Sequence, residues 1–139
     1  MTNNDIKQVP FILIDDNPLD LKISERLLLY AKLANRVTIF LSPLEALAAI
    51  RKAGKPEQAT VILLDIQMPE MNGFEFLAEY HELPPEIRKR YFIFMLSSTL
   101  DDADLIRVVE NHDALALLPK PLDYQALKAA LIKIQNLPI

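Results

Sequence analysis

The sequence predicts an α/β protein built on a doubly wound, five-stranded parallel sheet with helices on both faces. Five short apolar runs support this prediction, near residues 9–14, 37–40, 61–64, 91–96 and 114–118. The runs are nearly continuous rather than alternating, which is typical of parallel strands covered on both faces. Segments with helical periodicity lie between them, so strands and helices alternate along the chain.

Helix-start signals mark the segments between the apolar runs. Asn17-Pro18 places an N-cap residue before a proline at the first helical position, and Ser42-Pro43-Leu44-Glu45 has the pattern of a capping box. Pro84-Pro85 must stop the third helix, and one further turn is expected over 86–90. Three more N-cap candidates begin the remaining helices: Asn72, Asp101 and Asp123.

The first helix carries apolar residues at helical spacing. A helical wheel places one set toward the core, namely Leu19, Ile23, Leu27, Tyr30 and Ala34. The same wheel places Leu21 and Leu28 on the outer side, where we expect a surface that a partner protein could contact.

Composition excludes several classes of protein. A chain of 139 residues with 51% hydrophobic and 24% charged residues has the length and balance of one globular domain. Its net charge of -4 argues against nucleic acid or an anionic membrane as partner, and the absence of cysteine excludes disulfides and thiolate metal sites. No apolar run approaches the roughly 20 residues that span a bilayer. The polar start, Met1 to Val9, is unlike a signal peptide, so we expect a cytoplasmic protein.

Carboxylates end two of the predicted strands. Asp15-Asp16 follows the first run, and Asp65 ends the third. In the flavodoxin-like strand order 2-1-3-4-5 these strands are neighbours, and ligands of such sheets bind beyond the carboxyl ends of the strands. Three converging carboxylates repel one another, and a hard divalent cation such as Mg²⁺ removes that conflict. The sequence therefore predicts a Mg²⁺ site at this edge.

A hydroxyl and an ammonium end the fourth and fifth runs. Ser97 could bond a phosphoryl oxygen, and Lys120 could counter an anion held at Asp65. Taken singly, Lys120 is more often a surface lysine and Ser97 a turn residue. The ordered set favours a site that binds Mg²⁺ and accepts a phosphoryl group.

This set, with the nine residues Asp65-Ile66-Gln67-Met68-Pro69-Glu70-Met71-Asn72-Gly73 and with Lys120-Pro121, resembles the receiver domain of bacterial two-component response regulators. The resemblance runs from Val9 to about Gln135. It implies that Asp65 is the phospho-acceptor, Ser97 the switch hydroxyl and Lys120 the invariant lysine. It also implies a cis peptide bond at Lys120-Pro121, which a sharp turn toward Asp65 favours independently.

The resemblance further implies how Mg²⁺ is held. Asp16 and Asp65 are expected to ligate the ion directly, together with the backbone carbonyl of Gln67. Asp15 is expected to act mainly through water. A haloacid dehalogenase-type phosphohydrolase would need a second aspartate where this chain has Gln67, and usually a cap domain as well, so that reading is set aside.

The expected function is that of a phosphoryl-accepting signalling module rather than a turnover enzyme. We expect residues 1–139 to form a single receiver domain with no output domain. Its donor would be the phosphohistidine of a histidine kinase or histidine phosphotransfer domain, and its output a downstream protein target. One departure is Leu117, where the family usually has an aromatic switch residue. Leu117 keeps open an alternative, a phosphorylation-independent interaction scaffold.

Overall fold

The fold is known from a computed structural model that describes residues 6–135, and its centre is one parallel sheet. The strand order is β2-β1-β3-β4-β5, so the predicted doubly wound topology is confirmed. The strands are β1 (Val9–Ile14), β2 (Ala34–Phe40), β3 (Thr60–Asp65), β4 (Tyr91–Ser97) and β5 (Ala114–Pro119). The edge strand β2 begins three residues before its apolar run. The sequence did not mark this start, because two of these residues, Asn35 and Arg36, are polar and exposed.

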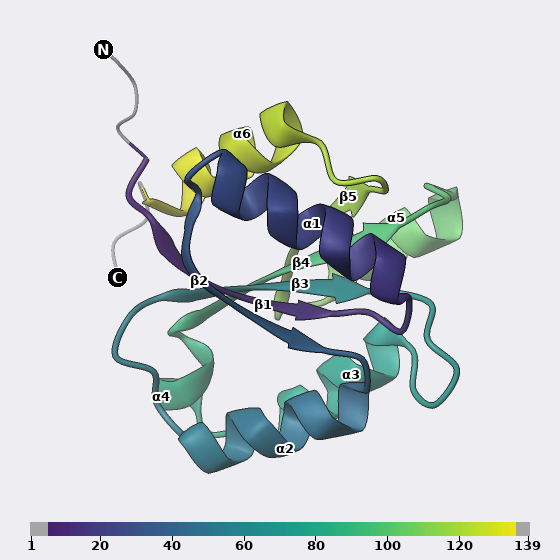
Figure 1. Cartoon of the computed structure of the whole chain (residues 1–139). Coiled ribbons are helices and arrows are strands. Elements are labelled where there is room, and N and C mark those ends of the chain that lie inside the picture. Colours follow the sequence, from purple (N-terminus) through teal and green to yellow (C-terminus); the bar gives the residue numbers. More distant parts are fainter. Residues whose placement is uncertain (1–5, 136–139) are drawn as a thin grey trace.

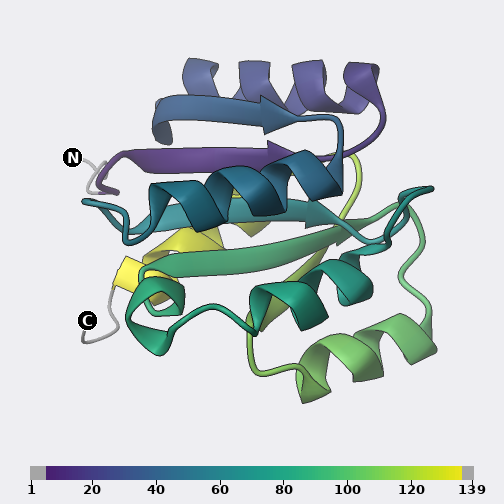
Figure 2. The same ribbon diagram turned by 90° about the horizontal axis from the view of Figure 1, so that it is seen from below.

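Helices cover both faces of the sheet, as Figures 1 and 2 show from two directions. One face carries α1 (Pro18–Tyr30) and α6 (Tyr124–Gln135). The other carries α2 (Pro43–Ala53), α3 (Gly73–Tyr80), the single turn α4 (Pro85–Arg88) and α5 (Asp102–Glu110). The turn α4 begins one residue earlier and ends two residues earlier than the turn predicted over 86–90. None of the described helices is both long and apolar enough to cross a membrane.

The predicted N-cap residues begin their helices. The Asn17 side chain accepts hydrogen bonds from the amides of Leu19 and Asp20, which fixes the first turn of α1 directly after β1. Asn72 and Glu75 form a reciprocal capping box at the start of α3. Ser42 accepts the amide of Glu45 and also donates its hydroxyl to Glu70 Oε1 at 3.1 Å, which ties α2 to the loop after β3.

Two hydrophobic clusters, one on each face of the sheet, hold the helices in place. All six residues of β3 are buried, because this central strand has a neighbour on each side and helices above and below. Odd-numbered residues of β3 pack against α1 and α6, and even-numbered residues pack against α2 and α3. Asp65, the last residue of β3, therefore has its backbone fixed by a strand that is buried along its whole length.

The orientation predicted for α1 is wrong. Leu21 and Leu28, expected on the outside, are buried, with 4% and 0% of their surfaces exposed. Leu19 and Tyr30, expected in the core, are 65% and 91% exposed. Leucines lie on both sides of this helix, so apolar spacing alone does not select the buried side. Ala34, counted in the helix from the sequence, opens β2 instead.

Candidate functional site

Three aspartates converge at the carboxyl ends of β1 and β3. These strands are adjacent, with Ile14 opposite Leu64, so Asp15, Asp16 and Asp65 follow at the same edge. One carboxylate oxygen from each residue lies within 4.8 Å of the other two. Asp15 and Asp65 are both 5% exposed, whereas Asp16 is exposed to solvent. The predicted acidic set is therefore compact and open to solvent on the side of Asp16.

The Lys120 ammonium lies against this cluster. Its Nζ is 2.7 Å from Asp15 Oδ2 and 3.4 Å from Asp65 Oδ1, and it also donates to Asp20 Oδ2 at 3.0 Å. The Lys120-Pro121 peptide bond is cis, as predicted. The lysine thus reaches from the end of β5, an edge strand, to the ends of β1 and β3.

Burial and repulsion make Asp65 a weak acid for an aspartate. Desolvation contributes most, the neighbouring Asp15 charge adds to it, and together they raise the Asp65 pKa from 3.8 to about 6. Lys120 and the Gln67 amide act in the opposite direction. For Lys120, burial alone would lower the pKa, but hydrogen bonds to Asp15 and Asp20 outweigh that effect and raise it. Lys120 is therefore a permanent cation here.

The donor set suits a hard divalent cation. Carboxylate oxygens are the ligands that Mg²⁺ prefers, and a dication would remove the repulsion that raises the Asp65 pKa. The Gln67 amide donates to Asp65 Oδ1 at 3.4 Å, so the backbone at Gln67 borders the cluster. Ligation by the Gln67 carbonyl stays a prediction.

Ser97, the last residue of β4, is buried at the same edge, with 2% of its surface exposed. Its backbone carbonyl accepts the Lys120 amide at 2.9 Å. Its hydroxyl accepts the amide of Thr99 at 3.1 Å and donates to the Thr99 carbonyl, so it holds the start of the next loop. Ser98, by contrast, is exposed and lines a hollow of about 280 Å³ beside Lys120.

The loop after Asp65 is closed by Gly73. The Gly73 amide donates to the Ile66 carbonyl at 2.7 Å. A side chain at this position would begin 2.7 Å from Met95 Cε and 2.8 Å from the Asp65 carbonyl, so only glycine fits. The glycine that ends the nine-residue motif therefore sets the close approach of α3 to the site.

The geometry agrees with comparisons to known proteins. The family model of the response regulator receiver domain matches residues 11–132. The chain belongs to this family. It is 41% identical to the response regulator receiver protein of Dyadobacter fermentans, whose crystal structure superposes with a TM-score of 0.85 over 90% of this chain and 96% of that one.

Two relatives match by sequence. Response regulator Rcp1 of Synechocystis is 27% identical over 104 residues, which are 73% of this chain and 69% of that protein. An uncharacterized response regulatory protein of Yersinia pestis is 38% identical over 93 residues, which are 67% of this chain. The match spans about a third (34%) of the length of the Yersinia protein. The chain is thus a receiver domain of a two-component system, a signalling module of a family that accepts phosphoryl groups and binds Mg²⁺ at an acidic pocket.

Leu117 is half-buried in β5, opposite Met95 of β4. It packs against the cluster beneath α2, α3 and α5. Met95 and Ser97 are two residues apart in β4 and face the same side of the sheet, so Leu117 lies on the same side as Ser97. This receiver therefore has an aliphatic side chain, Leu117, at the position where the family usually has an aromatic residue.

Asp20 is the residue that sequence reasoning missed. It lies in the first turn of α1, and its carboxylate pairs with Lys120, 100 positions away in the chain. An acid in the first turn of a helix already has an explanation in the helix dipole, so no local signal marks it.

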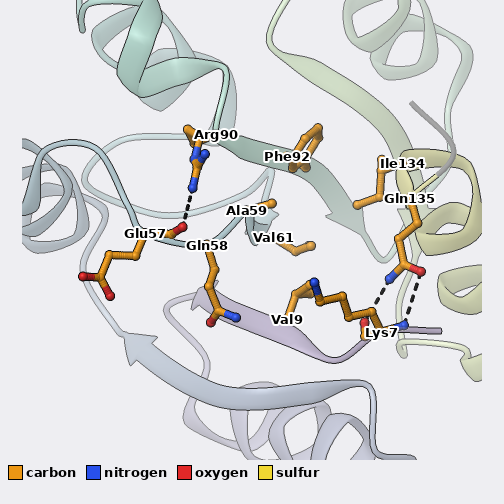
Figure 3. A pocket seen from close by; sticks show the side chains of 10 residues that line it. All are labelled: Lys7, Val9, Glu57, Gln58, Ala59, Val61, Arg90, Phe92, Ile134 and Gln135. Atoms are coloured by element: carbon orange, nitrogen blue, oxygen red, sulfur yellow. Dashed lines mark hydrogen bonds between the residues drawn. The ribbon is translucent and has the colours of Figure 1, made fainter. Parts of the chain in front are cut away.

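A larger hollow, of about 470 Å³, lies at the opposite end of the sheet (Figure 3). Its walls are mainly apolar and come from the starts of β1, β3 and β4 and the end of α6. Gln135 spans one side through hydrogen bonds with the backbone of Lys7, drawn as two dashed lines. None of the three clustered aspartates lines this hollow. The larger hollow is therefore separate from the candidate site, which is marked by its carboxylates and by the Lys120 ammonium.

Proposed function

We propose that this receiver accepts a phosphoryl group on Asp65 in a Mg²⁺-dependent transfer from a phosphohistidine. The observation that supports the proposal is the convergence of Asp65, two further acids and the Lys120 ammonium at one edge of the sheet. The donor would be a histidine kinase or a histidine phosphotransfer domain, and the output a downstream protein target.

The reaction needs a nucleophile, charge stabilisation and a leaving group. An oxygen of the Asp65 carboxylate attacks phosphorus as the P–N bond of the phosphohistidine breaks, and the imidazole nitrogen keeps the electron pair and takes up a proton. The Lys120 ammonium lies where it can bond a phosphoryl oxygen held on Asp65. Mg²⁺, held by Asp16, Asp65 and the Gln67 carbonyl with Asp15 acting through water, would neutralise negative charge on the transferring group.

Ser97 connects the phosphorylated site to the loop after β4. Its hydroxyl holds the Thr99 backbone in this structure. Bonding to a phosphoryl oxygen instead would release those contacts and shift an existing equilibrium between inactive and active conformations. Leu117 keeps open the alternative scaffold function, because no aromatic ring is present at this position to follow that movement, whereas the intact acidic set speaks against that alternative.

The outer side of α1 is the surface we propose for the phosphohistidine donor. Leu19, Ile23 and Tyr30 are 65%, 46% and 91% exposed, and they form an apolar stripe that begins beside the acidic edge. The surface therefore consists of these residues and not of Leu21 and Leu28, which are buried and cannot contact a partner.

Intact mass after incubation with acetyl phosphate tests the proposal. With Mg²⁺ the protein should gain one phosphoryl group, and with EDTA it should gain none. Asp65→Asn should gain none in either buffer, while Glu82→Gln, which changes an exposed carboxylate just past the end of α3 and outside the acidic cluster, should behave as the parent. An unmodified parent would favour the scaffold function, and an Asp65→Asn variant modified at the parental rate would refute the assignment of Asp65.

A further inference from the structure

Lys120 is shared among three carboxylates, of which Asp20 is the most exposed. The Asp20 side chain is 39% exposed, against 7% for both Asp15 and Asp65. Its Oδ2 lies 3.0 Å from Lys120 Nζ, closer than the 3.4 Å contact from Nζ to Asp65. In the unmodified protein, the ammonium is therefore held between the acidic cluster and α1.

The position of Asp20 is fixed by the backbone. The Asn17 side chain caps α1 by accepting hydrogen bonds from the amides of Leu19 and Asp20. These bonds fix the backbone of Asp20 in the first turn, close to the end of β1. The compact set of acids that could hold a metal comprises Asp15, Asp16 and Asp65 and does not include Asp20. Among the ion pairs of residues 6–135, Asp20 pairs with Lys120 alone. Its contact is thus with the lysine rather than with a cation site.

We propose that Asp20 is a positioning residue that holds Lys120 before phosphorylation and competes with the phosphoryl group for its ammonium. The inference rests on the proposed function of Asp65. An ammonium has three N–H donors, and three carboxylates surround this one. The contact to Asp65 is the longest of the three, so to come into hydrogen-bond contact with a phosphoryl oxygen held there, Lys120 must loosen its contact with Asp15 or Asp20.

Asp20 is the contact that costs least to give up. Its carboxylate lines the hollow of about 280 Å³ between α1 and the segment after β5, so water can replace the ammonium there. Asp15 is buried, and losing the ammonium would leave that carboxylate poorly solvated. Phosphorylation should therefore move Lys120 away from Asp20 and release the first turn of α1 from the site.

Asp20→Asn tests this competition. The variant keeps the side-chain volume and the Asn17 cap but loses the charge that holds Lys120. We expect the rate of phosphorylation by acetyl phosphate to rise about 2- to 5-fold, and the affinity for beryllofluoride at saturating Mg²⁺ to rise by the same factor. This factor corresponds to the interaction free energy of a partly exposed ion pair. Asp20→Glu keeps the charge and should remain near the parent. Glu25→Gln removes one negative charge elsewhere on α1 and should also remain near the parent.

Three readouts separate competition from a merely structural role. The gain in beryllofluoride affinity, measured by calorimetry, should shrink as ionic strength rises, because salt screens exposed charges. Mg²⁺ affinity should change less than beryllofluoride affinity. Thermal unfolding of the variant should stay close to that of the parent. An unchanged or lowered beryllofluoride affinity in Asp20→Asn would overturn the proposal, whereas a parent that accepts neither acetyl phosphate nor beryllofluoride would overturn the proposed function instead.

Discussion

Asp65→Asn should stabilise the Mg²⁺-free protein at neutral pH while it abolishes phosphorylation. The folded protein raises the Asp65 pKa from 3.8 to about 6, first through burial and then through Asp15. The folded state therefore binds this proton more tightly than the unfolded state does. The stability from that proton is fully present below pH 3.8 and is lost as the pH rises through about 6.

The magnitude follows from the pKa shift. A shift of about two units, at 1.36 kcal/mol each, corresponds to about 3 kcal/mol at pH 7 as an upper value. Asparagine is neutral at every pH and does not pay this cost. For a chain of this length the change in melting temperature is about 3 °C per kcal/mol, so the gain should reach up to about 10 °C at pH 7 and should be small near pH 4.

Thermal and urea unfolding in EDTA, at steps between pH 4 and pH 7.5, measure this difference. Subtracting the free energy of unfolding of the variant from that of the parent at each pH isolates the effect of the Asp65 carboxylate and its interactions with Asp15 and Lys120. Glu82→Gln, which removes one exposed carboxylate outside the acidic cluster, is the matched control. Added Mg²⁺ should stabilise the parent more than Asp65→Asn, because the variant lacks one acidic ligand. Equal stability of parent and variant at pH 7 in EDTA, or a pH-independent difference, would refute the reasoning.

Four further substitutions test the site and the fold. Lys120→Ala should retain Mg²⁺ binding by calorimetry, since an ammonium is not a ligand, but phosphorylation should no longer change its NMR spectrum; loss of Mg²⁺ binding would contradict its role. Gly73→Ala should lower the free energy of unfolding in urea by about 1–3 kcal/mol, because the new methyl group would lie 2.7 Å from Met95 Cε. Leu28→Ala should cost about 2–5 kcal/mol and Tyr30→Ala less than about 0.5 kcal/mol, the reverse of what the apolar spacing of α1 predicts.

The parts of the fold that follow from local signals could be predicted from the sequence. Continuous apolar runs defined the five strands, and Asn17, Asn72 and Asp101 marked helix starts because an N-cap acts on amides two or three residues away. The convergence of Asp15 and Asp65 followed from strand order, since parallel strands end at one edge.

The parts that depend on long-range packing could not be predicted. The buried side of α1 is chosen by the sheet beneath it, and the leucines on both sides of the helix satisfy the spacing rule equally well. The pairing of Asp20 with Lys120 joins residues 100 positions apart, so no spacing in the sequence records it. Ser97 and Ser98 follow the same apolar run, and the sequence alone does not show that Ser97 is the buried one of the two.

The two segments that border Asp65 are anchored by different contacts. The loop after β3 is pinned by the Gly73 amide, by the capping box of Asn72 and by the bond from Ser42 to Glu70, so it behaves as a rigid frame. The segment after β4 leads into α5, where Val108 is the one fully buried residue. Displacing α5 uncovers little apolar surface, whereas displacing α3 would expose five buried residues. We therefore expect a change at Asp65 to move α5 more readily than α3. A protein that binds this receiver according to its state should contact the surface of α5.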